Sequence, residues 1–149
     1  MTQKTIYIAS DHRGVALKSA LSNWLQEQGY NVVDMGTNDD SRVNASEYAV
    51  KVVEKMRGEE TSFGVLICGT GQAMTMTSNR FKHIRAAMCT NSYLALLARQ
   101  HNDANVLTLG SEIVGEGLAL DILETFLKTE AFPGRYRDRC QLLTDLGGL

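Results

Sequence analysis

The stretch Ser62-Phe-Gly-Val-Leu-Ile-Cys68-Gly-Thr-Gly-Gln-Ala-Met-Thr75 decides the fold. Residues 62–68 are apolar at nearly every position, which is typical of a strand buried on both faces of a sheet. A Gly-Thr-Gly turn follows at 69–71, and the pattern after it predicts a helix over 72–81. A buried strand that passes through a glycine turn into a helix indicates a parallel α/β sheet.

The rest of the chain repeats this alternation. Four more strands are predicted at residues 5–9, 31–35, 84–88 and 105–109. Five more helices are predicted at residues 15–28, 46–57, 91–100, 114–128 and 135–146. Strand and helix alternating five times predict an α/β fold with a mostly parallel sheet covered by helices on both faces. No internal repeat or linker interrupts the pattern, so we expect a single domain over residues 1–149.

The composition excludes several classes of protein. With 44% hydrophobic and 21% charged residues, the chain is neither disordered nor fibrous. A net charge of −2 provides no global positive field for nucleic acid or acidic membranes. No apolar run approaches the roughly 20 residues that span a bilayer. The start, Met1-Thr-Gln-Lys-Thr-Ile-Tyr-Ile, leads directly into a strand with no room for a signal peptide. We expect a soluble cytoplasmic protein that binds neither nucleic acid nor membranes.

The cysteines and histidines argue against disulfides and metals. The three cysteines, Cys68, Cys89 and Cys140, are odd in number and widely spaced, so a disulfide framework is not expected. The three histidines show no zinc-binding spacing, so no metal site is expected.

Cys68 ends the central strand at the edge where open parallel sheets bind their ligands. The glycines of the following turn let backbone N–H groups face an anion, and the same field favours a thiolate at Cys68. An acid–base cysteine beside an anion-binding loop is a coherent catalytic unit. The alternative is a core cysteine before a tight crossover turn. Dinucleotide and cysteine-phosphatase loops are excluded by Met74, and the P-loop ending Gly-Lys-Ser/Thr is absent.

Polar residues after two other elements are further candidates. Asp11 and His12 follow the first strand, where they suit hydroxyl and phosphate contacts, although Asp11 could simply cap the next helix. His101 and Asn102 lie between a helix and a strand. They could serve as a general acid and an oxyanion donor, or form an ordinary polar turn.

Two arginines of the last predicted helix share one face. Arg135 and Arg139 are four residues apart, so their guanidinium groups could grip one phosphate. The alternative is a charged surface helix.

Taken together, these motifs resemble the ribose-5-phosphate isomerase B family, which includes galactose-6-phosphate and allose-6-phosphate isomerases. The resemblance rests on Ser10-Asp11-His12, residues 67–71, Asn79, residues 99–103, Gly134-Arg135 and Arg139. It implies a three-layer, Rossmann-like α/β/α fold with a five-stranded parallel sheet. It also implies a homodimer or tetramer with active sites shared between subunits, and no metal or other cofactor.

The resemblance also implies roles for individual residues. Cys68 matches the base that moves a proton between C1 and C2 of an open-chain sugar, whereas one subgroup uses a glutamate where Met74 stands. Gly69, Thr70 and Gly71, with the partner subunit's Asn102, match the anion hole for the enediolate.

The remaining matched residues handle the rest of the sugar phosphate. Asp11 matches the residue that contacts the sugar hydroxyls, and the partner subunit's His101 matches the acid that opens the furanose ring. The residues matched to substrate or phosphate binding are His12, Asn79, Arg135 and Arg139.

Several departures from the family pattern surround the ligand. An aromatic residue is replaced by Ala45, and a Gly and a Ser of the anion loop are replaced by Ala73 and Thr75. Glu112 stands where a phosphate-binding arginine is common, and an acid facing a phosphate is repulsive. Tyr136 replaces a common histidine.

We therefore expect an aldose–ketose isomerase, with ribose 5-phosphate to ribulose 5-phosphate as the first reaction to test. One alternative is the same chemistry on another phosphosugar of four to six carbons. The other is a catalytically silent subunit or sugar-phosphate-binding module.

Overall fold

A single parallel sheet forms the centre of the computed structural model, which describes residues 4–149. Its strand order is β2-β1-β3-β5-β4, and every pairing is parallel. The strands are β1 (Thr5–Ser10), β2 (Asn31–Asp34), β3 (Phe63–Cys68), β4 (Ala86–Met88) and β5 (Val106–Gly110). The part of the single-domain and signal-peptide expectations that concerns residues 1–3 lies outside the described residues.

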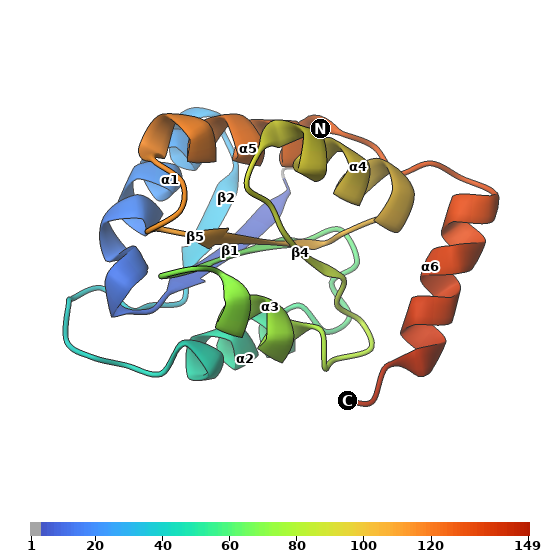
Figure 1. The fold of residues 1–149 in the computed structure, drawn as a ribbon, viewed down its shortest axis with the longest axis horizontal. Coiled ribbons are helices and arrows are strands. Elements are labelled where there is room, and N and C mark those ends of the chain that lie inside the picture. The colour runs from blue at the N-terminus through green and yellow to red at the C-terminus, as the bar shows by residue number, and fades with distance from the viewer. Residues whose placement is uncertain (1–3) are drawn as a thin grey trace.

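Helices cover both faces of the sheet, as Figure 1 shows. The helices are α1 (Val15–Glu27), α2 (Ala45–Lys55), α3 (Gln72–Ser78), α4 (Ser92–Asn102), α5 (Glu116–Lys128) and α6 (Arg135–Leu146), with a short 3-10 turn at His12–Gly14. Helices α1, α4 and α5 cover one face, and α2 and α3 cover the other, whereas α6 stands at the side of the molecule and packs on α4 (Figure 1). The expected three-layer, Rossmann-like α/β/α fold is confirmed.

Strand β3 divides the hydrophobic core into two halves. All six of its residues are buried, and it pairs with β1 on one side and β5 on the other. Because side chains alternate along a strand, Val65 and Ile67 pack under α1 and α5, while Leu66 and Cys68 pack under α2 and α3. None of the helices within residues 4–149 is long and apolar enough to cross a membrane.

Several element boundaries differ from the sequence prediction, and three of them concern the elements around Asn79, His101 and Asn102. Helix α3 ends at Ser78 rather than 81, and β4 begins at Ala86 rather than 84. Helix α4 continues to Asn102, so the two candidates at 101–102 lie in a helical turn rather than after it. Asp103 ends this helix in the left-handed conformation, with φ of 45° and its N–H bonded to the carbonyl of Arg99.

Glycine is required where β5 meets the turn after β3. A Cβ on Gly110 would lie 2.7 Å from backbone atoms of Thr70, which is closer than real Cβ contacts occur. The end of β5 therefore supports the Gly-Thr-Gly turn by direct backbone contact.

Replacing Gly110 by alanine tests this contact. We expect Gly110→Ala to lower the free energy of unfolding by about 1–3 kcal/mol, because the added methyl must displace backbone. Urea unfolding measures the change. The control is Gly117→Ala, whose Cβ would enter open space inside α5 and should leave stability equal or slightly higher. Equal stabilities of Gly110→Ala and wild type would contradict the contact.

Candidate active site

The carboxyl ends of β1, β3 and β5 are joined by backbone hydrogen bonds. The N–H of Asp11 donates to the carbonyl of Ile67 at 3.1 Å, and the N–H of Ser111 donates to the carbonyl of Cys68 at 2.8 Å. These bonds hold the loops that follow three neighbouring strands in one cluster, at the edge where parallel sheets bind ligands.

The Cys68 sulfur receives a hydrogen bond from the turn that follows it. Cys68 is 4% exposed, and the N–H of Gly71 donates to its Sγ at 3.2 Å. Gly71 has φ of +85°, and this left-handed conformation turns its amide back toward the sulfur. The turn therefore places a backbone donor directly against the sulfur.

The other two cysteines make different contacts. Burial raises the pKa of the Cys89 thiol to about 11, and its Sγ contacts the carbonyl of Ala87 at 3.9 Å. Burial also raises the pKa of Cys140, whose Sγ contacts the carbonyl of His101 at 3.7 Å. In both contacts the thiol is the donor and a backbone carbonyl is the acceptor. Cys68 alone among the three receives an N–H donor.

Two threonines that sequence reasoning did not select support the anion loop. The Thr75 hydroxyl donates to the carbonyl of Gly71 at 2.7 Å and shares a hydrogen bond of 2.6 Å with the hydroxyl of Thr108. Thr75, noted only as a departure from the family pattern, therefore fixes the loop to β5. Thr70 lies exposed at the tip of the loop, and its Oγ1 accepts from the N–H of Gln72 at 3.4 Å.

Asp11 and His12 lie beside this loop at the end of β1. Asp11 Oδ1 accepts from the N–H of Arg13 at 2.9 Å, so the capping role considered from the sequence is present. His12 Nδ1 accepts from the N–H of Val43 at 3.3 Å. A neutral imidazole that accepts at Nδ1 carries its proton on Nε2, which leaves His12 a free donor for an anion.

Arg13 and Glu112 form an ion pair next to the same loop. Arg13 Nη1 lies 3.0 Å from Glu112 Oε1, and both side chains are about half exposed. The sequence drew attention to Glu112 as a departure but not to Arg13. The pairing could not be inferred from the sequence, because 99 residues separate Arg13 from Glu112.

A second group of predicted site residues lies at the opposite end of the sheet, where the strands begin. Helix α4 runs back from the end of β4 to the start of β5, so its C-terminal residues His101 and Asn102 lie near the strand starts. Cys68 ends β3, whose six residues span about 16 Å. One chain therefore does not bring His101 or Asn102 to Cys68.

The second group is itself compact, and we call it the distal cluster (His101, Arg135, Tyr136 and Arg139). The rings of His101 and Tyr136 are stacked with centroids 4.8 Å apart. The guanidinium groups of Arg135 and Arg139 lie 5.1 and 5.8 Å from the same tyrosine ring. The structure thus gathers both predicted phosphate ligands of α6 around the predicted acid, and Tyr136 is the residue that connects them.

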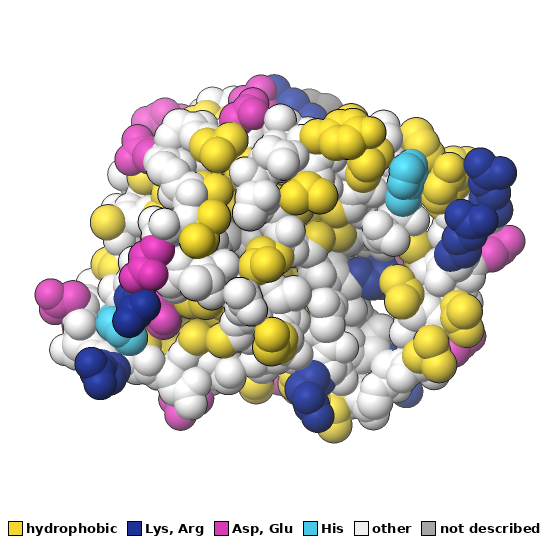
Figure 2. Space-filling view, viewed as in Figure 1, with side chains coloured by type: hydrophobic (Ala, Val, Ile, Leu, Met, Phe, Trp, Pro, Cys, Tyr) yellow, Lys and Arg dark blue, Asp and Glu magenta, His cyan; other side chains and the backbone are white. Residues whose placement is uncertain are grey.

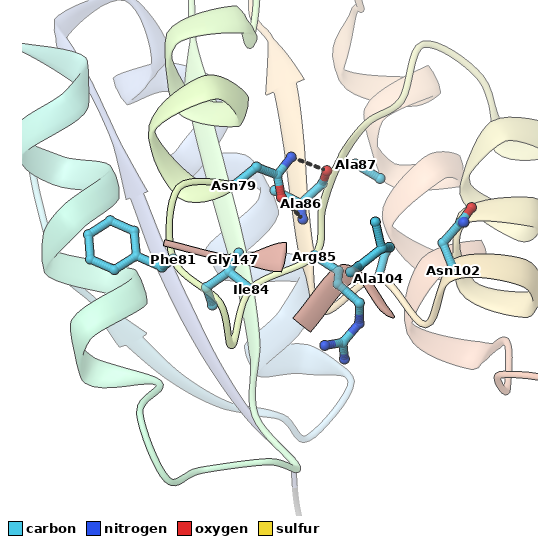
Figure 3. Close-up of a pocket in the computed structure, with 10 residues that line it drawn as sticks. Asn79, Phe81, Ile84, Arg85, Ala86, Ala87, Asn102, Ala104 and Gly147 are labelled. Atoms are coloured by element: carbon cyan, nitrogen blue, oxygen red, sulfur yellow. Dashed lines mark hydrogen bonds between the residues drawn. The ribbon is translucent and has the colours of Figure 1, made fainter. Parts of the chain in front are cut away.

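Asn79 is occupied by backbone contacts. Its Oδ1 accepts from the N–H of Ala86 at 2.7 Å, and its Nδ2 donates to the carbonyl of Ala86 at 2.9 Å. Figure 3 draws both bonds at one side of a cavity of about 400 Å³, with Asn102 across it and Gly147 of the C-terminal segment also lining it. Asn79 therefore fastens the end of α3 to β4, and its role in substrate binding stays a prediction.

Comparison with known proteins identifies the family. The profile of the family described as Ribose/Galactose Isomerase matches residues 6–143. Ribose-5-phosphate isomerase B of Escherichia coli is 40% identical over 141 residues, which cover 95% of each chain. The chain belongs to the ribose/galactose isomerase family. This membership confirms the resemblance found in the sequence and the expectation of an isomerase.

Solved structures extend the family likeness to the whole architecture. Ribose-5-phosphate isomerase B of Clostridium thermocellum is 42% identical with a TM-score of 0.93, and the match covers 95% of this chain and 96% of that one. The Mycoplasma genitalium family member, whose structure has ribulose-5-phosphate bound, is 36% identical with a TM-score of 0.93 over 97% of each chain.

Among residues 4–149, no group of three or more His, Cys, Asp or Glu side chains could hold a metal ion.

Removing the Asn79 side chain tests the clamp on β4. We expect Asn79→Ala to lower the free energy of unfolding by about 1–2 kcal/mol, since two hydrogen bonds to one exposed peptide are lost. Chemical denaturation measures this. The control is Asn23→Ala, because Asn23 is exposed on α1 and its side chain has no hydrogen bond to any of residues 4–149. If both variants unfold alike, Asn79 does not hold β4.

Proposed function

We propose that the protein is an aldose–ketose isomerase of a phosphorylated sugar, interconverting ribose 5-phosphate and ribulose 5-phosphate. The observation that carries this proposal is the Gly71 N–H directed at Cys68 Sγ at the ligand-binding edge of the sheet. The substrate is supported by two relatives, the E. coli isomerase named for ribose 5-phosphate and the M. genitalium structure with bound ribulose-5-phosphate.

The proposed reaction is a proton transfer between neighbouring carbons. The Cys68 thiolate removes the proton from C2 of the open-chain aldose, and the electron pair left behind forms the C1–C2 double bond of an enediolate with negative charge on O1. The thiol returns the proton to C1, while the hydroxyl proton on O2 passes to O1. A positioned base typically contributes about 10²–10⁴-fold to the rate, and one oxyanion donor about 10²–10³-fold.

The anion loop and its surroundings have the groups that this reaction needs. The amides of Gly69 and Thr70 stabilise the enediolate oxygen, while the left-handed Gly71 shapes the loop and directs its own N–H at Cys68, and Asp11 contacts the sugar hydroxyls. Proton transfer between a thiol and carbon, with amides stabilising the charge, requires neither metal nor organic cofactor. We propose that the enzyme works without either, in the cytoplasm.

A second copy of the chain completes the site in this proposal. The partner subunit's His101 opens the furanose ring, and the partner subunit's Asn102 adds a donor to the anion hole. The partner subunit's Arg135 and Arg139 hold the phosphate together with His12. The separation of these residues from Cys68 within one chain supports a shared site in a homodimer or tetramer.

An exposed apolar surface beside the anion loop supports this assembly. Its residues are Met76, Met88, Tyr93 and Leu94, which are 39–66% exposed. Met88 is adjacent to the loop, because a Cβ on Gly71 would lie 3.3 Å from its Cγ. Hydrophobic side chains are spread over the face of the molecule drawn in Figure 2. A partner that covered this surface would reach the loop at the same time.

The same chemistry on another phosphosugar is a second candidate. It is favoured by Ala45, Ala73 and Glu112. Ala45 leaves room where the family pattern has an aromatic residue, Ala73 adds a methyl group where the loop pattern has glycine, and Glu112 replaces a common arginine. A panel of four- to six-carbon phosphosugars separates it from the first candidate by kcat/KM. A silent subunit would show binding without turnover on every member of the panel.

Substitution of single cysteines tests the base. We expect Cys68→Ala to reduce kcat for ribose 5-phosphate by at least about 10³-fold, because the proton acceptor is removed. The matched controls are Cys89→Ala and Cys140→Ala, which remove thiols that act as donors and should keep kcat within about threefold. The assay contains a chelator and no added metal. Turnover by Cys68→Ala at the wild-type rate would move the base elsewhere.

Mixing two inactive variants tests the shared site. Homo-oligomers of Cys68→Ala and of His101→Ala should each be inactive, since every site lacks one group. Co-refolding equal amounts should restore about one quarter of wild-type activity in a dimer, because half the dimers are mixed and each has one intact site. No recovery, despite mixed oligomers seen by native mass spectrometry, would place both residues in one chain's site.

A further inference from the structure

The Arg13–Glu112 ion pair lies directly over the anion loop. A Cβ on Gly69 would be 3.1 Å from both Cδ and Nη1 of Arg13 and 3.5 Å from Cδ of Glu112. The pair connects the turn after β1 with the turn after β5, and the loop after β3 passes beneath it. It therefore forms part of the wall that an incoming ligand meets.

The backbone segments that carry Arg13 and Glu112 are each held by a hydrogen bond. The N–H of Glu112 donates to the carbonyl of Gly69 at 2.9 Å, and the N–H of Arg13 donates to Asp11 Oδ1 at 2.9 Å. The Arg13 side chain is consequently held at both ends: its backbone lies in the short helical turn, and its guanidinium group pairs with the Glu112 carboxylate. A group held in this way loses little freedom when a ligand binds.

The charges of the side chains around the anion loop indicate what Arg13 contributes. Asp11 and Glu112 are both acidic, and Arg13 is the cation between them. Without Arg13, two carboxylates would face an anionic substrate and repel it. With Arg13 in place, Glu112 is neutralised, and a guanidinium has five N–H donors of which the ion pair uses one.

We propose that Arg13 is a substrate-binding, specificity-determining residue that donates to the phosphate of the sugar, and that Glu112 is a positioning residue that holds Arg13 over the loop. This inference rests on the proposed function for the identity of the anion. It explains how an arginine is still present beside the anion loop, although Glu112 stands where the family pattern commonly has an arginine. Both side chains are about half exposed, at 56% and 55%, so the pair contributes little to folding and its arrangement is available to a ligand.

Reversal of the pair tests the proposal. We expect Arg13→Glu to raise KM for ribose 5-phosphate by at least about tenfold with kcat within about threefold, because binding rather than chemistry is weakened. The double variant Arg13→Glu/Glu112→Arg restores one arginine and one acid at the same wall, and its KM should return to within about threefold of wild type. A purely structural pair would change the unfolding midpoint instead of KM.

A second ion pair of the chain provides the control. Arg57 lies 3.0 Å from Glu54, both are exposed, and α2 ends there at the opposite edge of the sheet from Cys68. Arg57→Glu changes the net charge by the same amount as Arg13→Glu and should leave KM unchanged. Arg13→Met, which adds no negative charge, should raise KM in the same direction as Arg13→Glu.

Binding of inorganic phosphate separates this proposal from the proposed function. Titration calorimetry of the wild type, Arg13→Glu and the double variant requires no turnover, and the Kd should follow the same order as KM. If the three Kd values follow this order but the wild type isomerises no sugar, only the proposed reaction fails. If Arg13→Glu and Arg13→Met keep wild-type KM and Kd, or if the double variant stays as weak as Arg13→Glu, the role of Arg13 is overturned.

Discussion

The burial of β3 on both faces is the constraint on which the rest of the structure depends. A strand with helices above and below must be apolar throughout, and it must then turn sharply so that the next helix can cover one face. Residues 69–71 make that turn immediately after Cys68, and the left-handed Gly71 directs its amide back to the sulfur. The hydrogen-bonded thiol is therefore a direct consequence of how the central strand ends.

The same parallel topology separates the two groups of polar residues. Loops that follow strands meet at one edge of the sheet, whereas residues that end a helix lie at the other edge. Asp11, His12 and Cys68 belong to the first group, and His101 belongs to the distal cluster. A fold of this kind can combine the two groups only by placing two chains against each other, so we regard assembly as part of the proposed catalytic unit rather than an addition to it.

Much of this arrangement could be predicted from the sequence, because it depends on patterns that are local. The apolar run at 62–68 and the alternation around it predicted the five strands and the six α-helices, although not the 3-10 turn at His12–Gly14. Position after a strand was sufficient to propose Asp11 and Cys68 as site residues. Boundaries were missed where a side chain bonds to the backbone of another element. Asn79 at the end of α3 bonds to Ala86 at the start of β4, where the predicted helix end and strand start were both displaced. The spacing of apolar residues along the chain does not indicate such hydrogen bonds.

The Arg13–Glu112 ion pair at the anion loop is another contact that the sequence could not predict. Taken alone, Glu112 is an acid beside the proposed phosphate site, and the sequence gives no reason to connect it with a residue 99 positions away. In three dimensions the pair restores the balance of charge, since an arginine from the β1 turn stands against the carboxylate from the β5 turn. A binding site constrains the charge and donors at a point in space, and neighbouring strands can supply them in more than one way. A departure at one position is therefore interpretable only with the residues that face it.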